Sequence, residues 1–213
     1  MNFKAYFFDL DGTLIDSSKD IAQATNYTLQ ALGYSPMPEE EIMKHVGYGG
    51  RKLLEGVLGK SDQELIDRAV SIFREYYFEN PVVYTQPYPN AVELLEKLKK
   101  EGKKLAVITN KYENVSKEIL KKLGLNDYID MVIGGDSLEE KKPSPKPVLF
   151  AIESFGDKPK DTLMIGDSET DIISGKKANT KTCLVTFGYG KKDLAVSYKP
   201  DYIISSLKEV LTL

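Results

Sequence analysis

The chain has 213 residues, of which 41% are hydrophobic and 29% are charged, a balance typical of folded globular proteins. The formal net charge of −3 argues against partners such as nucleic acid or an anionic membrane surface. The single cysteine, Cys183, excludes an intramolecular disulfide, and no apolar run approaches the roughly 18 residues of a membrane span. These features predict a cytoplasmic protein without a signal peptide or a membrane anchor.

The first predicted element is a buried strand over residues 5–8, which runs into a polar turn at Asp9. Residues 17–86 then show four helical patterns in succession, with no strand signal between them. Two residue pairs have the spacing of a capping box that opens a helix: Ser17 with Asp20, and Ser61 with Glu64. The segment therefore indicates a small helical bundle.

From residue 87 onward, helical patterns alternate with short apolar runs. Strands are predicted over 104–109, 131–134, 162–166, 182–187 and 201–205, and helices over 91–101, 115–123, 147–155, 171–177 and 207–211. Such alternation favours a parallel sheet with helices on both faces, and the strand over 5–8 belongs to it by composition. We therefore expect an α/β, Rossmann-like core over 1–16 and 87–213, interrupted by an all-helical cap over 17–86.

Polar residues follow the predicted strands, and ligands of open parallel sheets bind at that edge, outside the carboxyl ends. The candidates, in chain order, are Asp9, Asp11, Thr109, Asn110, Lys111, Lys142, Asp167 and Asp171. Four carboxylates meeting at one edge would repel one another strongly unless a divalent cation and the Lys142 ammonium neutralised them. Because the available ligands are oxygens, without a histidine or cysteine cluster, Mg²⁺ is favoured over zinc.

Asp9 and Asp11 flank one residue, so at the end of a strand both side chains can reach the same ligand. One carboxylate can attack phosphorus while the other manages the proton on the leaving oxygen. Gly12 permits a tight turn behind them, and the N–H groups of such a turn can cradle phosphate oxygens. The pair alone therefore fits two interpretations, covalent chemistry through an aspartyl phosphate or a turn or helix cap that follows the strand.

Four motifs, in order, resemble those of the haloacid dehalogenase-like hydrolase superfamily, and the resemblance covers essentially the whole chain. They are Asp9-Leu10-Asp11-Gly12-Thr13-Leu14, Val107-Ile108-Thr109-Asn110-Lys111, Lys142-Pro143-Ser144-Pro145 and Gly166-Asp167-Ser168-Glu169-Thr170-Asp171. The resemblance implies Asp9 as nucleophile and Asp11 as general acid and base. It implies phosphate ligands at Thr109, Asn110 and Lys142.

The same resemblance implies Mg²⁺ held by Asp9, the Asp11 backbone carbonyl and Asp167. Asp171 would then orient Lys142 or support the metal from outside its ligand shell. The acid at position 11 points to a phosphatase, because a halide leaving group needs no proton whereas an alkoxide does. Ile21 stands where the sugar-phosphate mutases of the superfamily usually carry histidine, which argues against a mutase.

Within the superfamily the chain most resembles phosphoglycolate phosphatases. The subgroup features are Val46-Gly47-x-Gly49 with Leu53-Leu54, and Phe187-Gly188-Tyr189-Gly190. We expect a Mg²⁺-dependent phosphatase of a small phosphorylated metabolite, with 2-phosphoglycolate as the first choice. The alternatives are a pyrophosphatase, a nucleotidase or a sugar-phosphate phosphatase of the same superfamily. The non-enzyme alternative is a receiver-like phosphate-binding regulatory protein.

The sequence also carries expectations for four further residues. Arg51 follows a glycine-rich joint between predicted helices, and it either meets a substrate anion or belongs to a plain turn. Lys111 is the second candidate for a substrate contact. His45 is expected to be structural or at the surface, because no nucleophile or metal cluster lies near it in sequence. Cys183 lies in a predicted strand and is expected in the hydrophobic core.

Overall fold

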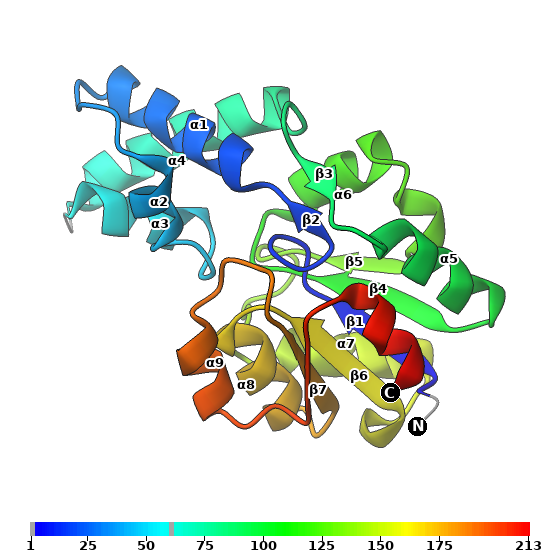
Figure 1. The fold of residues 1–213 in the computed structure, drawn as a ribbon. Coiled ribbons are helices and arrows are strands. Elements are labelled where there is room, and N and C mark those ends of the chain that lie inside the picture. The colour runs from blue at the N-terminus through cyan, green and yellow to red at the C-terminus, as the bar shows by residue number, and fades with distance from the viewer. Residues whose placement is uncertain (1–2, 60–61) are drawn as a thin grey trace.

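The computed structural model describes residues 3–59 and 62–213. Among them, six parallel strands form a sheet in the order β5-β4-β1-β6-β7-β8. Their bounds are Ala5–Phe8 for β1, Lys104–Ile108 for β4, Met131–Ile133 for β5, Thr162–Gly166 for β6, Lys181–Val185 for β7 and Tyr202–Ile204 for β8. Figure 1 shows this sheet at the centre of the molecule. The predicted parallel α/β sheet is confirmed.

The central strand β1 pairs with a parallel strand on each side. Phe8 pairs with Val107 of β4 on one side and with Ile165 of β6 on the other. All four residues of β1 are buried, as expected for a strand covered on both faces. Because the three strands end together, the residues that follow β1, β4 and β6 meet at one edge of the sheet.

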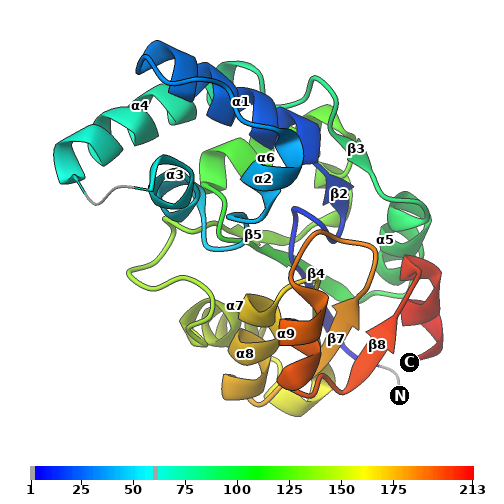
Figure 2. The ribbon, with the colours of Figure 1, turned by 60° about the vertical axis from the view of Figure 1, so that its left-hand side comes forward.

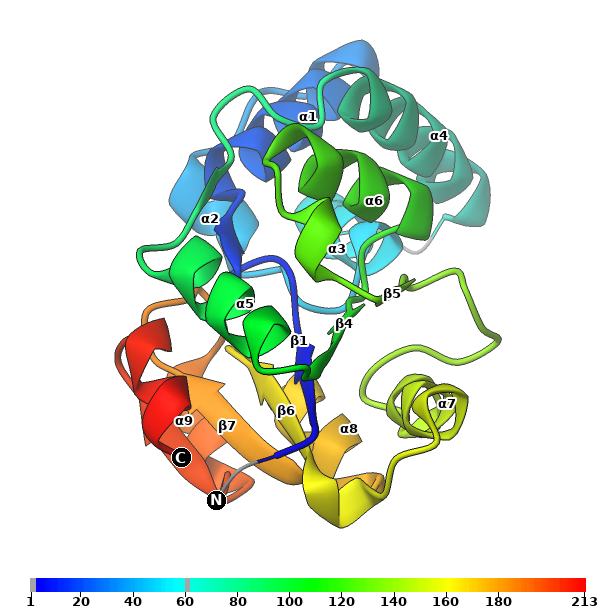
Figure 3. The same cartoon turned by 90° about the vertical axis from the view of Figure 1, so that its right-hand side faces the viewer.

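Helices cover both faces of the sheet. On one face Tyr6 and Phe8 share a hydrophobic cluster with residues of α5 (Ala91–Lys100), α6 (Glu113–Lys122) and the 3₁₀ helix η3 (Leu207–Thr212). On the other face Ala5 and Phe7 pack with α7 (Lys146–Phe155), while α8 (Glu169–Lys177) and α9 (Lys192–Ser197) cover the strands beyond. Figure 3 shows α5 and α7 on opposite sides of β1. Successive side chains of β1 point to opposite faces of the sheet, so they belong to two separate hydrophobic layers.

Within the described residues, four helices lie between β2 (Ile15–Asp16) and β3 (Gln86–Pro87), and we call them the cap helices. They are α1 (Ser18–Ala31), α2 (Glu39–Met43), α3 (Gly50–Leu58) and α4 (Gln63–Glu79). Figures 1 and 2 show them gathered beyond the carboxyl edge of the sheet, with α1 alongside α4. β2 and β3 pair antiparallel where the chain enters and leaves the cap helices. The division into a core and a cap domain at residues 17 and 86 stays a prediction.

The two predicted capping boxes have different outcomes. The box of Ser17 with Asp20 is wrong, because the Ser17 hydroxyl donates to Asp11 and contacts the Tyr189 hydroxyl instead of closing the helix start. Asp20 turns away from the helix and binds the chain returning from α4. Ser61 lies outside the described residues, and Asp62 caps α4 by accepting a hydrogen bond from the Leu65 amide.

The predicted strands and helices after residue 87 begin and end within two residues of their observed bounds. Helix α9 was not predicted, because its six residues carry no apolar repeat long enough to recognise. The last helix is a 3₁₀ helix rather than an α-helix. No helix of the described ranges 3–59 and 62–213 is long and apolar enough to cross a membrane.

Candidate active site

The first motif follows β1 without a break. The Asp9 amide donates to the Ile165 carbonyl at 2.8 Å, which continues the strand pairing into the motif. Gly12 then turns the chain at φ +81°, and its amide donates to the Ile15 carbonyl at 2.9 Å. A Cβ at Gly12 or at Gly188 would overlap the Asp167 carboxylate. Glycine at these two positions therefore leaves room around that carboxylate.

Lys142 lies at the centre of the acidic cluster. Its ammonium is 2.9 Å from Asp9 Oδ1 and 2.6 Å from Asp171 Oδ1, and only 1% of its side chain is exposed. Burial alone would lower the pKa of Lys142, but the Asp171 and Asp9 charges outweigh it and raise that pKa. The second Asp171 oxygen accepts from the Ser168 amide at 3.1 Å and the Ser168 hydroxyl at 2.7 Å. Both Asp171 oxygens are thus engaged in orienting Lys142 and the start of α8.

The single Lys142 ammonium only partly compensates the three carboxylates of Asp9, Asp167 and Asp171. Carboxylate oxygens of Asp9, Asp167 and Asp171 lie within 4.8 Å of one another. Burial raises the pKa of Asp9 to about 7, with Lys142 opposing the shift and Asp171 adding to it. Burial, followed by the charges of Asp9 and Asp171, raises the pKa of Asp167 well above its usual value. An all-oxygen cluster of this kind can hold a hard divalent cation, which would relieve the repulsion.

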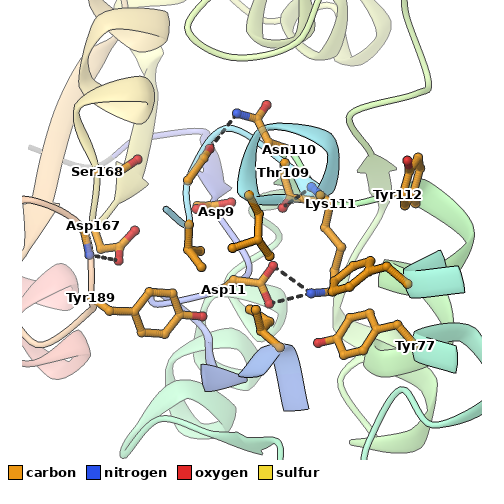
Figure 4. Close-up of a pocket in the computed structure, with 18 residues that line it drawn as sticks. Asp9, Asp11, Tyr77, Thr109, Asn110, Lys111, Tyr112, Asp167, Ser168 and Tyr189 are labelled. Carbon is orange, nitrogen blue, oxygen red and sulfur yellow. Dashed lines mark hydrogen bonds and ion pairs between the residues drawn. The ribbon is translucent and has the colours of Figure 1, made fainter. Parts of the chain in front are cut away.

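Asp11 is held by a separate set of partners (Figure 4). The Lys111 ammonium lies 3.0 Å from both Asp11 oxygens, and the Ser17 hydroxyl donates to Oδ1 at 2.5 Å. The Tyr189 hydroxyl lies 2.9 Å from the Ser17 hydroxyl. Burial alone would lower the pKa of Lys111, but the Asp11 carboxylate and Tyr77 raise it, so the ammonium stays charged. Asp11 is therefore fixed from two sides.

Thr109 and Asn110 follow β4, as predicted, and both line the same cavity as Asp9 and Asp11. Thr109 is 4% exposed, and its hydroxyl accepts from the Lys111 amide at 3.2 Å. The Asn110 side-chain amide donates to the Gly47 carbonyl at 2.8 Å and the Lys142 carbonyl at 3.0 Å. The predicted phosphate contact of the Asn110 side chain therefore lacks support, because its donors already join the cap loop to the Lys142 loop.

Arg51 lies apart from this cavity. Its guanidinium pairs with Asp67 and donates to Gln63 at 3.3 Å, both on α4, and it is not among the residues that line the cavity. The structure thus gives the predicted substrate contact of Arg51 no support, because the side chain serves packing between α3 and α4. The His45 ring lies directly over Gly56, which agrees with a structural role, and Cys183 is fully buried in the core.

The cavity has a polar floor and an apolar roof. The floor comes from the loops that follow β1, β4, β6 and β7, and it carries Asp9, Asp11, Thr109, Lys111 and Asp167. The roof comes from the cap helices and their loops, through Ile21, Val46, Gly47, Gly49, Gly50, Leu53, Phe73 and Tyr77. A small ligand held here would meet its charged partners on the floor alone.

Three residues of this site were not predicted as functional. Ser17 was predicted to cap a helix, Tyr189 was part of a subgroup motif, and Tyr77 had no predicted functional role. Ser17 and Tyr77 are buried and Tyr189 is partly exposed, and desolvation of the Tyr189 hydroxyl raises its pKa well above the usual value. The Asp167 carboxylate also accepts a hydrogen bond from the Gly190 amide at 2.8 Å. Because the donor is a backbone group, no pattern of side chains in the sequence predicts this contact.

Comparisons with known proteins agree with this geometry. A family model described as haloacid dehalogenase-like hydrolase matches residues 6–185. A phosphoglycolate phosphatase of Aquifex aeolicus is 46% identical, covering 99% of this chain and 96% of that protein. One of Neisseria meningitidis is 43% identical, covering 97% and 92%. The crystal structure of a predicted phosphoglycolate phosphatase from Haemophilus somnus superposes with a TM-score of 0.94 at 32% identity, covering 100% and 98%.

Proposed function

The chain belongs to the haloacid dehalogenase-like hydrolase family, and on that premise we propose that it is a Mg²⁺-dependent phosphatase of 2-phosphoglycolate. The observation that carries the proposal is the pairing of two acids with separate partners, Asp9 against Lys142 and Asp11 against Lys111. Environments that differ in this way suit two carboxylates with different roles. The cytoplasm is the proposed location, and a small phosphorylated metabolite the proposed partner.

The first half of the reaction forms an aspartyl phosphate. An Asp9 oxygen bonds to phosphorus while the bond from phosphorus to the ester oxygen breaks. Asp11 gives its proton to that departing oxygen, so the leaving group departs as an alcohol. In this proposal the phosphoryl oxygens are bound by the Lys142 ammonium, which lies 2.9 Å from Asp9, and by the hydroxyl of Thr109, which lines the cavity.

The second half releases inorganic phosphate. Asp11, now ionised, takes a proton from a water molecule, whose oxygen bonds to phosphorus as the bond from phosphorus to Asp9 breaks. Asp9 returns to its carboxylate form and the Lys142 ammonium again pairs with it. The apolar roof of the cap helices limits access of further water while the intermediate exists.

The donor set fits a magnesium ion. Asp9 and Asp167 would hold it, with the Asp11 backbone carbonyl as the resemblance implies, whereas Asp171 is engaged by Lys142 and Ser168. The glycines at positions 12 and 188 leave the space beside Asp167 that a side chain would fill. When bound, the ion neutralises negative charge on the phosphoryl group and on the two carboxylates.

The names of the relatives support phosphoglycolate as the substrate, because two of them match this chain over more than nine-tenths of their own length. The cavity supports a small substrate, since among the residues that the structure describes Tyr77 brings the one polar side-chain group to its cap side. Pyrophosphatase, nucleotidase and sugar-phosphate phosphatase activities are the rivals that an assay must separate.

The test is release of inorganic phosphate from 2-phosphoglycolate, pyrophosphate, nucleoside monophosphates and hexose phosphates, each with Mg²⁺ and after chelation by EDTA. We expect the highest kcat/KM for 2-phosphoglycolate and activity restored by added Mg²⁺. Asp9→Asn is expected to lower kcat by about 10³-fold or more, because the amide cannot form the acyl phosphate. The exposed Asp193→Asn serves as the matched control. Turnover retained in Asp9→Asn, or a preference for another ester, would contradict the proposal.

A further inference from the structure

The floor of the cavity holds one cation to which the proposed chemistry assigns no contact with the substrate. Among residues 3–59 and 62–213, Lys111 is the one lysine or arginine that lines the cavity. Its side chain is 9% exposed, and its ammonium lies 3.0 Å from both oxygens of Asp11. An ammonium carries three N–H donors, so pairing with two oxygens leaves donor capacity over.

A second donor lies beside it. Tyr77 belongs to α4 and is 3% exposed, and its hydroxyl is buried without a hydrogen-bond partner of good geometry among the described residues. The Lys111 ammonium lies 4.4 Å from the centre of the Tyr77 ring. Figure 4 shows both side chains on the side of Asp11 away from Asp167. Buried hydroxyls are nearly always hydrogen-bonded, so an unpaired one that lines a cavity points to a ligand acceptor.

We propose that Lys111 and the Tyr77 hydroxyl together form the subsite for a carboxylate on the substrate, and that they determine specificity for short phosphorylated 2-hydroxy acids. The inference rests on the proposed function. Asp11 marks where the ester oxygen must lie, because it exchanges a proton with that atom. In 2-phosphoglycolate a single CH₂ separates the ester oxygen from the carboxylate, so the carboxylate falls beside whatever contacts Asp11. The Lys111 ammonium and the Tyr77 hydroxyl lie at that place.

The placement of Lys111 and Tyr77 also explains how the site would select a substrate by its length. In a longer ester the second anion would lie beyond Lys111, against the apolar roof formed by residues such as Leu53 and Phe73. A buried hydroxyl without an acceptor, beside an ammonium with an unused donor, makes a poor site for an ester whose alkyl group carries no charge. Because Lys111 follows β4 and Tyr77 lies on a cap helix, the bound carboxylate would also join the cap helices to the sheet edge.

The experiment compares 2-phosphoglycolate with ethyl phosphate, which carries a methyl group in place of the carboxylate. For Lys111→Met we expect the ratio of their kcat/KM values to fall about 100-fold or more, mainly through KM for 2-phosphoglycolate. Tyr77→Phe should lower the ratio about 10-fold, and Lys111→Arg should retain more of it than Lys111→Met. Lys117→Met, an exposed lysine on α6, is the control with the same loss of charge.

Each result has a defined reading. If Lys111→Met left the ratio of the two kcat/KM values unchanged, the subsite would be overturned. An equal fall in kcat/KM for both esters is such a result, since Lys111 would then act only through Asp11. Tyr77→Phe separates these cases because it removes only the hydroxyl and keeps both the Lys111–Asp11 pair and the ring that faces the ammonium. A wild-type enzyme that hydrolyses ethyl phosphate as well as 2-phosphoglycolate would instead refute the proposed substrate, a failure visible without any variant.

Discussion

At the scale of the residue, Asp11 illustrates how several partners hold one carboxylate, the proposed general acid and base, in place. Ser17 and Lys111 hold its oxygens from two sides, and Tyr189 in turn holds Ser17. The two hydroxyls belong to residues 172 positions apart in the chain. Ser17 therefore positions the proposed general acid, and Tyr189 acts one step further away.

Ser17→Ala tests this positioning. We expect kcat for alkyl phosphates such as ethyl phosphate to fall about 10-fold, because the freed carboxylate spends less time aligned with the departing oxygen. Activity toward p-nitrophenyl phosphate should change less, since nitrophenolate departs readily without a proton. Steady-state kinetics of both substrates measure the difference, with Ser18→Ala as the neighbouring control. An equal loss for both substrates would mean that Ser17 does not act through Asp11.

The residues that sequence predicted at the site and those it did not differ in a physical way. Asp9, Asp11 and Asp167 stand directly after apolar strands, so their placement follows from the sheet, and the structure brings them to one edge. Ser17 and Tyr189 depend on loops that meet only in the folded chain. Ser17 also precedes a helix, where serine is common as a cap, so local pattern favoured the wrong partner.

At the scale of the element, Asp20 joins the start of α1 to the segment that leads into β3. Its Oδ2 accepts from the amides of Val83, Tyr84 and Thr85 at 3.0, 3.0 and 2.9 Å and from the Thr85 hydroxyl at 2.6 Å. Asp20 is 2% exposed. One buried carboxylate thus ties together the two chain segments that connect the cap helices to the rest of the molecule.

Asp20→Asn removes the charge that strengthens these bonds and places an N–H₂ group among donors. We expect the free energy of unfolding to fall by about 2–3 kcal/mol, the range for hydrogen bonds to a charged group. Urea denaturation followed by circular dichroism measures it. Asp67→Asn breaks an exposed ion pair with Arg51 and should cost less than about 1 kcal/mol. Equal losses in the two variants would show that Asp20 contributes no more than a surface charge.

Elements that are continuously buried were predicted well, whereas very short elements were predicted poorly. Strand β1 and strand β6 are buried from end to end and were located to the residue. The two-residue pair of β2 with β3 has no pattern of its own, since its pairing follows from the return of the chain after α4. Helix α9 is likewise too short for a period to be recognised.

At the scale of the whole molecule, the fold is built around negative charge that it does not neutralise by itself. Asp9 and Asp167 are buried, and burial raises the pKa of both, that of Asp9 to about 7. A carboxyl group whose pKa is higher in the folded than in the unfolded chain stabilises the fold at low pH. That stability is lost as the pH rises from about 4 toward the folded pKa.

We therefore expect the metal-free protein in EDTA to become less stable as the pH rises from 4 to 8, and Mg²⁺ to restore stability at pH 8 by binding the folded state. Asp167→Asn removes one buried charge, so its melting temperature in EDTA at pH 8 should exceed that of the wild type by about 2–4 °C. It should also lose the increase that Mg²⁺ gives the wild type, because the amide is a poor ligand. Thermal denaturation at each pH, with and without Mg²⁺, measures both effects. A wild type that Mg²⁺ does not stabilise, or a variant that it stabilises equally, would contradict a metal at Asp9 and Asp167.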